Sequence, residues 1–296
     1  MDFSNYPLSN RYYGGSEKKI GIIINGSPYM LKFQKNTAFG LRSNHISEYI
    51  GSHVFALLGF PTQETYLGTY RGEQVVACKD FIEQGVQFVP FNDVGERSLD
   101  QDKERYQYSY DDIIKMLQDN SKLTQVEETI HSFWVIYIVD ALLGNFDRHG
   151  SNWGFIKKNN AYSLAPVFDN GSCLFPNMDD EIEMETVMNS DEETKKRVFT
   201  FPTSQILLNG KISSYYEVIR SCAFPECNSA LKAVCKKLDL YRVYTLIDNT
   251  PLISETHKRF YKHMLSARYE LMIKASYDLL ERITDESSNN DGNNLP

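Results

Sequence analysis

Gly144-Asn145-Phe146-Asp147-Arg148-His149-Gly150-Ser151-Asn152 is the stretch on which the interpretation of this chain depends. It places acidic, basic and amide side chains directly after a long apolar segment, and Asp147 and Asn152 within it have the spacing Asp-x4-Asn. Aspartate and asparagine are common in loops of every kind, so this spacing alone is a weak signal. Its meaning depends on the segments on either side.

Those flanking segments predict a helix before the loop and a β-hairpin after it. Residues 127–143 are strongly apolar and have a helical pattern, which is typical of a buried helix. Residues 153–156 and 162–168 predict two short strands joined by a polar turn. The hairpin would return the chain to Asp169, so a second carboxylate is expected beside the first loop.

This combination of groups is what phosphoryl transfer requires. The reaction needs a carboxylate near the acceptor hydroxyl, and magnesium ions held by the oxygen atoms of Asp and Asn side chains. We therefore interpret Asp147 as the base or acceptor-orienting group, and Asn152 and Asp169 as magnesium ligands, with ATP as the phosphate donor. Helix, loop, hairpin and second carboxylate together are much more specific than any one of them.

The first third of the chain predicts strands with one helix. Residues 19–24 and 28–33 are strand-like and flank Asn25-Gly26, a strong two-residue hairpin turn. Lys32, in the returning strand, is positioned to contact the phosphates of a nucleotide. Residues 44–58 have a helical apolar pattern, and Glu48 on this helix is the expected ion-pair partner of Lys32.

Two further segments are expected to contact the nucleotide. Gly14, Gly15, Ser16 and Lys18 precede the first long strand, and their backbone N–H groups could approach phosphate. Ordinary turn chemistry is the alternative explanation for these glycines. Further on, Val75-Val76-Ala77-Cys78-Lys79-Asp80-Phe81 is expected to lead into a hinge, where backbone groups of Lys79 and Phe81 would meet the adenine edge. A plain buried strand is the alternative here.

Composition excludes several classes of protein. The 296 residues carry a formal charge of −8, which argues against a general nucleic-acid binder. None of the five cysteines forms a Cys-x-x-Cys pair, so we expect a reducing compartment rather than a disulfide framework. We find no signal peptide and no apolar run long enough to span a bilayer, so we expect a cytoplasmic protein without membrane insertion.

These patterns predict a two-lobed α+β fold with a cleft between the lobes. We expect a β-rich N-terminal lobe over residues 1–84, a helical C-terminal lobe over residues 85–286, and a disordered tail over residues 287–296. The acidic stretch 176–197 is expected to be a solvated surface loop. The rest is expected to be helical, ending in a long amphipathic helix with Ser254 as its N-cap.

At these residues the chain resembles the HipA-like serine/threonine kinases, a bacterial family. The resemblance covers most of the chain, and its motifs are Gly-Asn-Phe-Asp147-Arg-His-Gly-Ser-Asn152, Pro-Val-Phe-Asp169-Asn-Gly and Val-Ala-Cys-Lys-Asp-Phe81. It implies a protein-kinase-like fold, ATP and Mg²⁺ as cofactors, and transfer to Ser or Thr of a protein substrate. By the same resemblance Ser16 is a candidate autophosphorylation site. Analogy with a secreted member of the family suggests secretion or translocation into a host.

Three other functions remain open at this point. The Asp-Arg-His-x-x-Asn pattern that begins at Asp147 also matches the loops of phosphoinositide kinases, so the acceptor could be a lipid or a small molecule. A kinase scaffold can also serve as a non-catalytic binding module. Finally, Asp147 and His149 could form an Asp-x-His metal pair of a metallohydrolase, which would need further histidine ligands.

Overall fold

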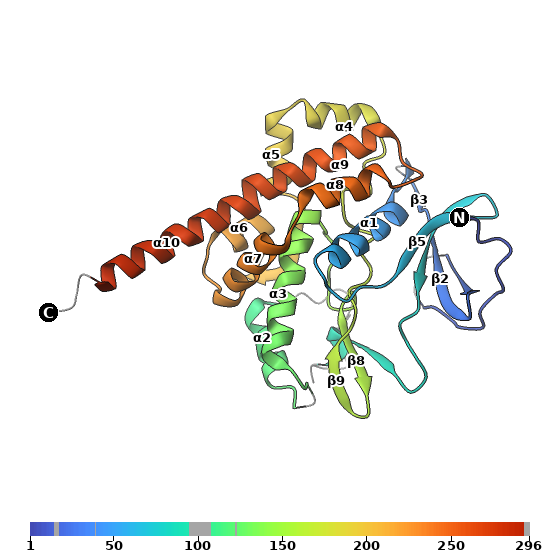
Figure 1. The fold of residues 1–296 in the computed structure, drawn as a ribbon, viewed down its shortest axis with the longest axis horizontal. Helices are drawn as coiled ribbons and strands as arrows, with labels where there is room; N and C mark the ends of the chain where they lie inside the picture. Colours follow the sequence, from blue (N-terminus) through green and yellow to red (C-terminus); the bar gives the residue numbers. More distant parts are fainter. Residues whose placement is uncertain (15–17, 39, 95–107, 122, 293–296) are drawn as a thin grey trace.

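The computed structural model describes residues 1–14, 18–38, 40–94, 108–121 and 123–292. Figure 1 shows a strand-rich N-terminal region beside a larger helical region, and this arrangement confirms the α+β fold expected from the sequence. In the described residues, no helix combines the length and the hydropathy needed to cross a membrane.

The N-terminal region is built on a four-stranded antiparallel sheet. Its strands, in spatial order, are β1 (Lys19–Ile24), β2 (Ser27–Phe33), β6 (Glu73–Lys79) and β5 (Thr65–Tyr70). The turn between β1 and β2 has positive φ angles at Asn25 and Gly26, which confirms the predicted hairpin. A short hairpin of β3 (Asn36–Thr37) and β4 (Gly40–Leu41) follows β2.

The two faces of this sheet are covered differently. Helix α1 (Asn44–Leu57) packs on one face, where Val76 and Cys78 of β6 join the main hydrophobic core. On the other face, Phe3 from the N-terminal segment packs into a smaller core with Ile22 and Leu31. The sheet is therefore anchored from both sides, and the N-terminal segment is part of its structure.

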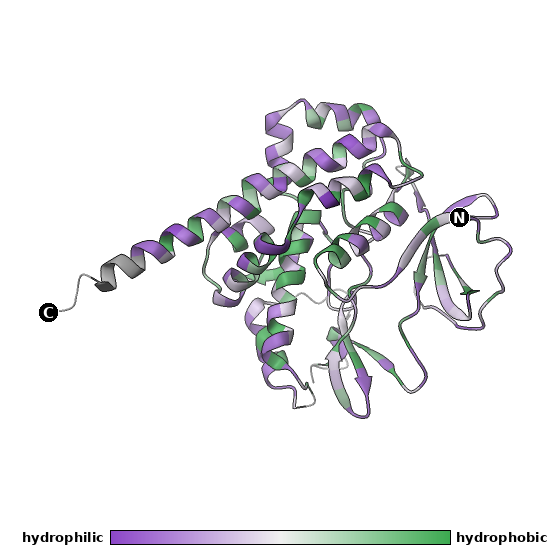
Figure 2. Cartoon of the chain, viewed as in Figure 1, coloured by the Kyte–Doolittle hydropathy of each residue, from purple (hydrophilic) through white to green (hydrophobic). Residues whose placement is uncertain are grey.

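Helix α3 (Val126–Leu143) forms the centre of the helical region. Most of its length is coloured as hydrophobic in Figure 2, and 13 of its 18 residues are buried. The helix ends at Gly144, which has the left-handed conformation (φ 66°) that commonly terminates helices. Helix α2 (Tyr110–Gln118) packs beside it. The loop 144–152 therefore starts from a fixed point in the core.

A three-stranded sheet follows the loop. Strands β8 (Gly154–Lys158) and β9 (Ala161–Leu164) form the predicted hairpin, and β7 (Gln87–Pro90) pairs with β8. The short helix η1 (Phe91–Asp93) continues from β7. Within residues 85–286 the sequence predicts strands only at 153–156 and 162–168, so β7 is an additional element. Its register with β8 pairs residues 87–90 with residues 154–157, directly after the loop 144–152.

The acidic stretch 176–197 is not a solvated loop, contrary to the sequence-based expectation. It contains α4 (Glu181–Met188) and α5 (Asp191–Phe199), capped by the side chains of Asp180 and Ser190. Met184 and Val198 are buried, and both helices pack against α9. The charged residues made the stretch resemble a loop, but a few buried apolar side chains per helix and good N-caps are sufficient to fold it.

The remaining chain is mainly helical, as expected, with one additional hairpin. The elements are β10 (Thr203–Leu208), β11 (Lys211–Ser214), α6 (Tyr215–Arg220), α7 (Pro225–Lys237), α8 (Leu240–Asp248), α9 (Glu255–Arg268), the π-helix η2 (Tyr269–Lys274) and α10 (Ala275–Gly292). Ser254 caps α9 by accepting the backbone N–H of His257, as predicted. We expected a disordered tail from residue 287, but α10 continues to Gly292.

Candidate active site

A cleft of about 630 Å³ lies between the N-terminal sheet and the segment that ends at Asp169. Its walls come from the N-terminal segment, from strands β1, β2, β6 and β7, from the segments before β5 and after β6, and from the segment after β9. The lining residues are Arg11, Tyr12, Tyr13, Gly14, Lys19, Met30, Lys32, Gln63, Cys78, Asp80, Phe81, Ile82, Phe88, Phe168 and Asp169. Several residues predicted to contact a nucleotide therefore share one cavity.

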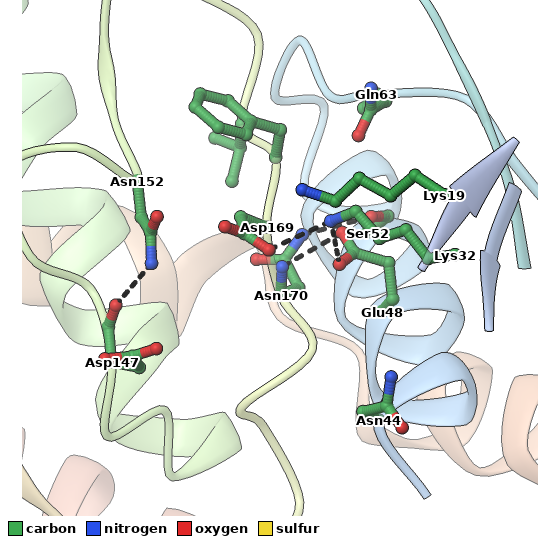
Figure 3. A network of polar contacts seen from close by, with 12 residues as sticks. Lys19, Lys32, Asn44, Glu48, Ser52, Gln63, Asp147, Asn152, Asp169 and Asn170 are labelled. Carbon is green, nitrogen blue, oxygen red and sulfur yellow. Dashed lines mark hydrogen bonds and ion pairs between the residues drawn. The ribbon is translucent and has the colours of Figure 1, made fainter. Parts of the chain in front are cut away.

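Lys32 lies at the centre of the polar network in this cleft (Figure 3). Its Nζ atom is 2.7 Å from Glu48 Oε2 and 2.9 Å from Asp169 Oδ1. Lys32 and Glu48 are buried, whereas the Asp169 side chain is 40% exposed. The structure therefore brings together three predicted residues from β2, from α1 and from the segment after β9.

The charges in this network stabilise one another. Burial alone would lower the pKa of the Lys32 ammonium, but the Asp169 and Glu48 carboxylates raise this pKa well above its ordinary value. Burial likewise would raise the pKa of Asp169, but Lys32, together with Arg148 and Lys19, lowers it to about 2. At neutral pH Lys32 is therefore a cation and Asp169 an anion.

Glu48 and Gly51 on α1 fix the position of the segment around Asp169. Glu48 Oε1 accepts the backbone N–H of Asn170, while the Asn170 side chain donates to Ser52 Oγ. Gly51 permits this close approach, because a Cβ atom there would lie only 2.6 Å from the Cβ of Asn170. Asp169 itself has φ +58°, an uncommon conformation for a residue with a side chain. Helix α1 thus positions both Lys32 and Asp169.

Asp147 occupies a partly exposed position in the loop after α3. Its backbone N–H donates to Asn145 Oδ1, and its side chain is 49% exposed. Ser151 N–H donates to His149 Nδ1, so a neutral His149 ring carries its proton on Nε2, which lies 4.0 Å from Asp147 Oδ1. Burial raises the pKa of Asp147, the Asp169 charge acts in the same direction, and His149 opposes them.

Asn152 and Asp169 have the donor atoms that a magnesium site needs. Asn152 Nδ2 donates to the backbone carbonyl of Asp147 at 2.7 Å, which leaves Oδ1 as the available atom of this amide. Among the described residues, neither Asn152 Oδ1 nor Asp169 Oδ2 has a hydrogen-bond partner. Amide and carboxylate oxygens are the ligands that Mg²⁺ prefers, so these two residues fit the ion.

Arg148 joins the loop to the Asp169 segment, a role that the sequence reasoning missed. Its buried guanidinium forms two hydrogen bonds with Asp140 of α3, at 2.8 and 2.9 Å. It also donates to the backbone carbonyls of Asn152 and Phe168 and to Asn170 Oδ1. A lone aspartate in an otherwise apolar helix was the available signal, because a buried carboxylate needs a cationic partner.

The predicted phosphate-loop residues are separated in the structure. Gly14 lines the cleft, whereas Gly15 and Ser16 lie outside the described residues. Lys18 does not reach the cleft, because its Nζ pairs with Glu73 at 2.6 Å and lies over the Phe33 ring. The neighbouring Lys19 lines the cleft instead. Successive strand residues face opposite sides of a sheet, and Lys19 is paired with Lys32 across β1 and β2.

The predicted hinge residues also differ from each other. The Lys79 N–H donates to the Glu64 carbonyl, and the Lys79 carbonyl accepts Gln63 Nε2, so both backbone groups already have protein partners. Phe81 lines the cleft, and its ring contacts the rings of Phe88 and Phe168. In the described part of the chain, no partner is seen for the Phe81 backbone N–H or carbonyl.

Comparison with known proteins agrees with this arrangement. Residues 12–239 match the HipA-like C-terminal domain family. The chain belongs to the HipA-like family. The curated serine/threonine-protein kinase CtkA of Helicobacter pylori is 34% identical to it over 271 residues, which cover 89% of this chain and 83% of CtkA.

Solved structures of HipA-like proteins have the same fold. The crystal structure of the H. pylori proinflammatory kinase CtkA matches with a TM-score of 0.88 and 30% identity, over 96% of this chain and 98% of that one. HipA from a Shewanella oneidensis toxin–antitoxin complex with HipB and operator DNA matches with a TM-score of 0.57 and 12% identity, over 92% of this chain and 67% of that one. The second match supports the fold alone. Together with the sequence relationship, the first identifies the chain as a HipA-like kinase.

Proposed function

We propose that this HipA-like chain is an ATP- and magnesium-dependent serine/threonine protein kinase. The observation that carries the proposal is that Lys32 contacts both Glu48 and Asp169. Arg148, the residue after Asp147, holds this arrangement to the loop by donating to the backbone carbonyls of Asn152 and Phe168. Phosphoryl transfer depends mainly on positioning and on charge neutralisation, and this network supplies both. The relationship to CtkA supports Ser or Thr of a protein as the acceptor.

In this proposal the cleft binds ATP with its adenine near Phe81. The Phe81 backbone N–H and carbonyl are available to the adenine edge, whereas the Lys79 groups are already engaged. Met30, Phe88 and Phe168 supply apolar surface for the base. Lys32 and Lys19 face the same cavity from neighbouring strands, so both can neutralise phosphate charge.

Asn152 and Asp169 would hold Mg²⁺. When bound, the ion would offset the negative charge that develops on the phosphates during transfer. The low pKa of Asp169, about 2, keeps its carboxylate ionised at every physiological pH. Lys32 neutralises part of this charge and holds Oδ1, so that Oδ2 remains as the oxygen for a ligand.

Asp147 would orient the acceptor hydroxyl and accept its proton. The hydroxyl oxygen forms a bond to the γ-phosphorus, the bond from that phosphorus to the β–γ bridging oxygen breaks, and ADP leaves. The raised pKa of Asp147 makes the carboxylate a stronger base than an ordinary aspartate. The hydrogen bond from Asn152 to the Asp147 backbone keeps base and metal ligand in fixed relation.

The proposal has three further parts, which concern the lobes, an autophosphorylation site and the cellular compartment. The kinase lobes are proposed to be residues 1–84 and 85–286. Ser16, in the segment beside Gly14, is proposed as an autophosphorylation site, by analogy with the family. All five cysteines are free thiols, and we propose a reducing compartment such as the cytoplasm.

A transfer assay tests this function. The purified protein is incubated with γ-labelled ATP, Mg²⁺ and a protein mixture, and protein, lipid and free phosphate fractions are separated and analysed by mass spectrometry. We expect label on Ser or Thr of protein, lost in Lys32→Met and on chelation of Mg²⁺. Label that appears only in lipid or small-molecule fractions would contradict the proposal.

A further inference from the structure

A second groove, of about 280 Å³, begins at Phe146, the residue that precedes Asp147. Phe175 and Met178, from the segment that follows Asp169, form part of its wall, and Phe201, which follows α5, forms another part. Glu183, Lys196 and Arg197 lie at its charged rim. The groove is separate from the proposed nucleotide cleft, with which it shares no lining residue.

The floor of this groove is an aromatic cluster that remains partly open. The rings of Phe146 and Phe201 are stacked with centroids 6.3 Å apart, and those of Phe175 and Phe201 are 6.4 Å apart. Phe175 is buried, but Phe201 is 48% exposed. Aromatic surface that gathers around a hollow and stays exposed is typical of a binding site.

The charges at the rim are unequally matched. Arg197 forms ion pairs with Glu193 at 2.5 Å and with Glu183 at 3.3 Å. Lys196 is exposed, and within the residues that the structure describes it has no ion-pair partner. Arg197, and after it Lys196, lowers the pKa of Glu193, but no ion pair fixes the Lys196 ammonium, so it can also meet an acidic group of a peptide.

The groove begins one residue before Asp147, the residue that would serve the acceptor hydroxyl. The Phe146 carbonyl accepts a hydrogen bond from Gln205 Nε2 at 2.7 Å, and Asn145 holds the backbone N–H of Asp147, so both residues have fixed positions. Neighbouring residues of a peptide are about 3.8 Å apart. A residue within three positions of an acceptor hydroxyl at Asp147 can therefore reach the groove at Phe146.

We propose that this groove binds a large apolar side chain of the protein substrate, within three residues of the acceptor serine or threonine. Lys196 favours an acidic residue next to that side chain. The proposal rests on the proposed kinase function, and it specifies the substrate as a peptide that combines Ser or Thr with an apolar and an acidic neighbour.

The test uses the full chain, MgATP and a library of Ser/Thr peptides in which each of the three positions on either side of the acceptor is varied. We expect one position to favour Phe, Leu or Met over Ala or Gly by about ten-fold or more in kcat/KM. Phe201→Ala should remove most of this preference by raising KM for the apolar peptides, with little change for peptides that carry Ala there. Tyr241→Ala is the control, because Tyr241 is an exposed aromatic residue on α8 outside the groove.

A second pair of variants tests the rim. Lys196→Glu should reverse the preference for an acidic neighbour, whereas Lys195→Glu makes the same charge change at a residue that pairs with Asp191 outside the groove. Phosphorylation without any positional preference, or a preference that survives Phe201→Ala, would overturn the groove proposal and leave the kinase function intact. Absence of phosphate transfer to any peptide or protein would overturn both. A dimer that Phe201→Ala converts to a monomer would assign the groove to a second copy of this chain.

Discussion

Replacement of Arg148 by methionine is expected to destabilise the fold and to impair catalysis separately. The Arg148 side chain is only 9% exposed and forms two hydrogen bonds with the buried Asp140 carboxylate, which also accepts one from Asn145. Removing one partner of a buried ion pair costs about 3–5 kcal/mol, because the remaining charge is left without compensation. For a chain of this size 1 kcal/mol corresponds to about 2–4 °C, so we expect Tm to fall by about 6–20 °C.

A double-mutant cycle separates the buried charge from general loss of packing. Arg148→Met combined with Asp140→Asn should be no less stable than Arg148→Met alone, because the second change removes the unpaired carboxylate, with a coupling energy of about 0.5–3 kcal/mol. Arg282→Met is the control, since Arg282 is exposed and bonds only to its own helix. Thermal and urea denaturation measure these values. Additive effects of the two changes, or a loss no larger than in the control, would refute the reasoning.

The catalytic effect is measured well below Tm, where the variant is folded. Arg148 also holds the Phe168 carbonyl and Asn170 Oδ1, so its loss releases the segment that carries Asp169. Phosphate transfer should therefore fall by more than the unfolded fraction explains. Arg148→Lys, which keeps the charge but lacks the planar fork, should retain more stability than Arg148→Met and still lose activity. Full activity in Arg148→Lys would contradict the role in positioning.

Three further predictions concern the cleft. Gly51→Ala should cost about 1–3 kcal/mol and weaken MgATP binding in calorimetry, because its Cβ would lie 2.6 Å from Asn170 Cβ; unchanged affinity would contradict the close packing. The pKa of Asp169 is lowered from 3.8 to about 2, so the carboxylate contributes its full stability above pH 3.8 and loses it as the pH falls toward 2. When Tm is measured against pH, Asp169→Asn should not show this loss. Lys19→Ala should weaken MgATP binding by about ten-fold, whereas Lys18→Ala should not, and equal effects would contradict the assignment of faces.

The sequence predicted those parts of the site that depend on local patterns. The Asn25-Gly26 turn, the apolar helix before Asp147 and the hairpin after it each have a short-range signal, and together they indicated where Lys32 and Asp169 would meet. Lys18 was expected in a phosphate-binding loop before the first strand, whereas its Nζ lies beside Glu73 and the neighbouring Lys19 lines the cleft.

The parts that could not be predicted depend on contacts between distant segments. Strand β7 has only four residues and ends in a proline, and it forms by pairing with β8, more than 60 residues later in the chain. Helices α4 and α5 are stabilised by packing on α9, which no pattern within their own charged sequence indicates. The approach of Gly51 to Asn170 joins two regions that only the folded chain brings together.

The arrangement of Lys32, Glu48 and Asp169 supports a site in which one set of residues binds the nucleotide and a different residue accepts the proton. Asp147 lies outside the cavity that contains Lys32, and its contacts are with the loop itself. Loss of the Asp147 carboxylate should therefore affect transfer without affecting the affinity for nucleotide.

The most direct test of the central claim is to measure transfer and binding on one variant, Asp147→Asn. We predict that phosphate transfer to protein falls by about 10²–10⁴-fold, the range for the loss of a positioned acid–base group, while calorimetry gives an MgATP affinity within about two-fold of the original protein. Transfer at the original rate, or loss of MgATP binding together with transfer, would contradict the assignment of Asp147 as the group that serves the acceptor.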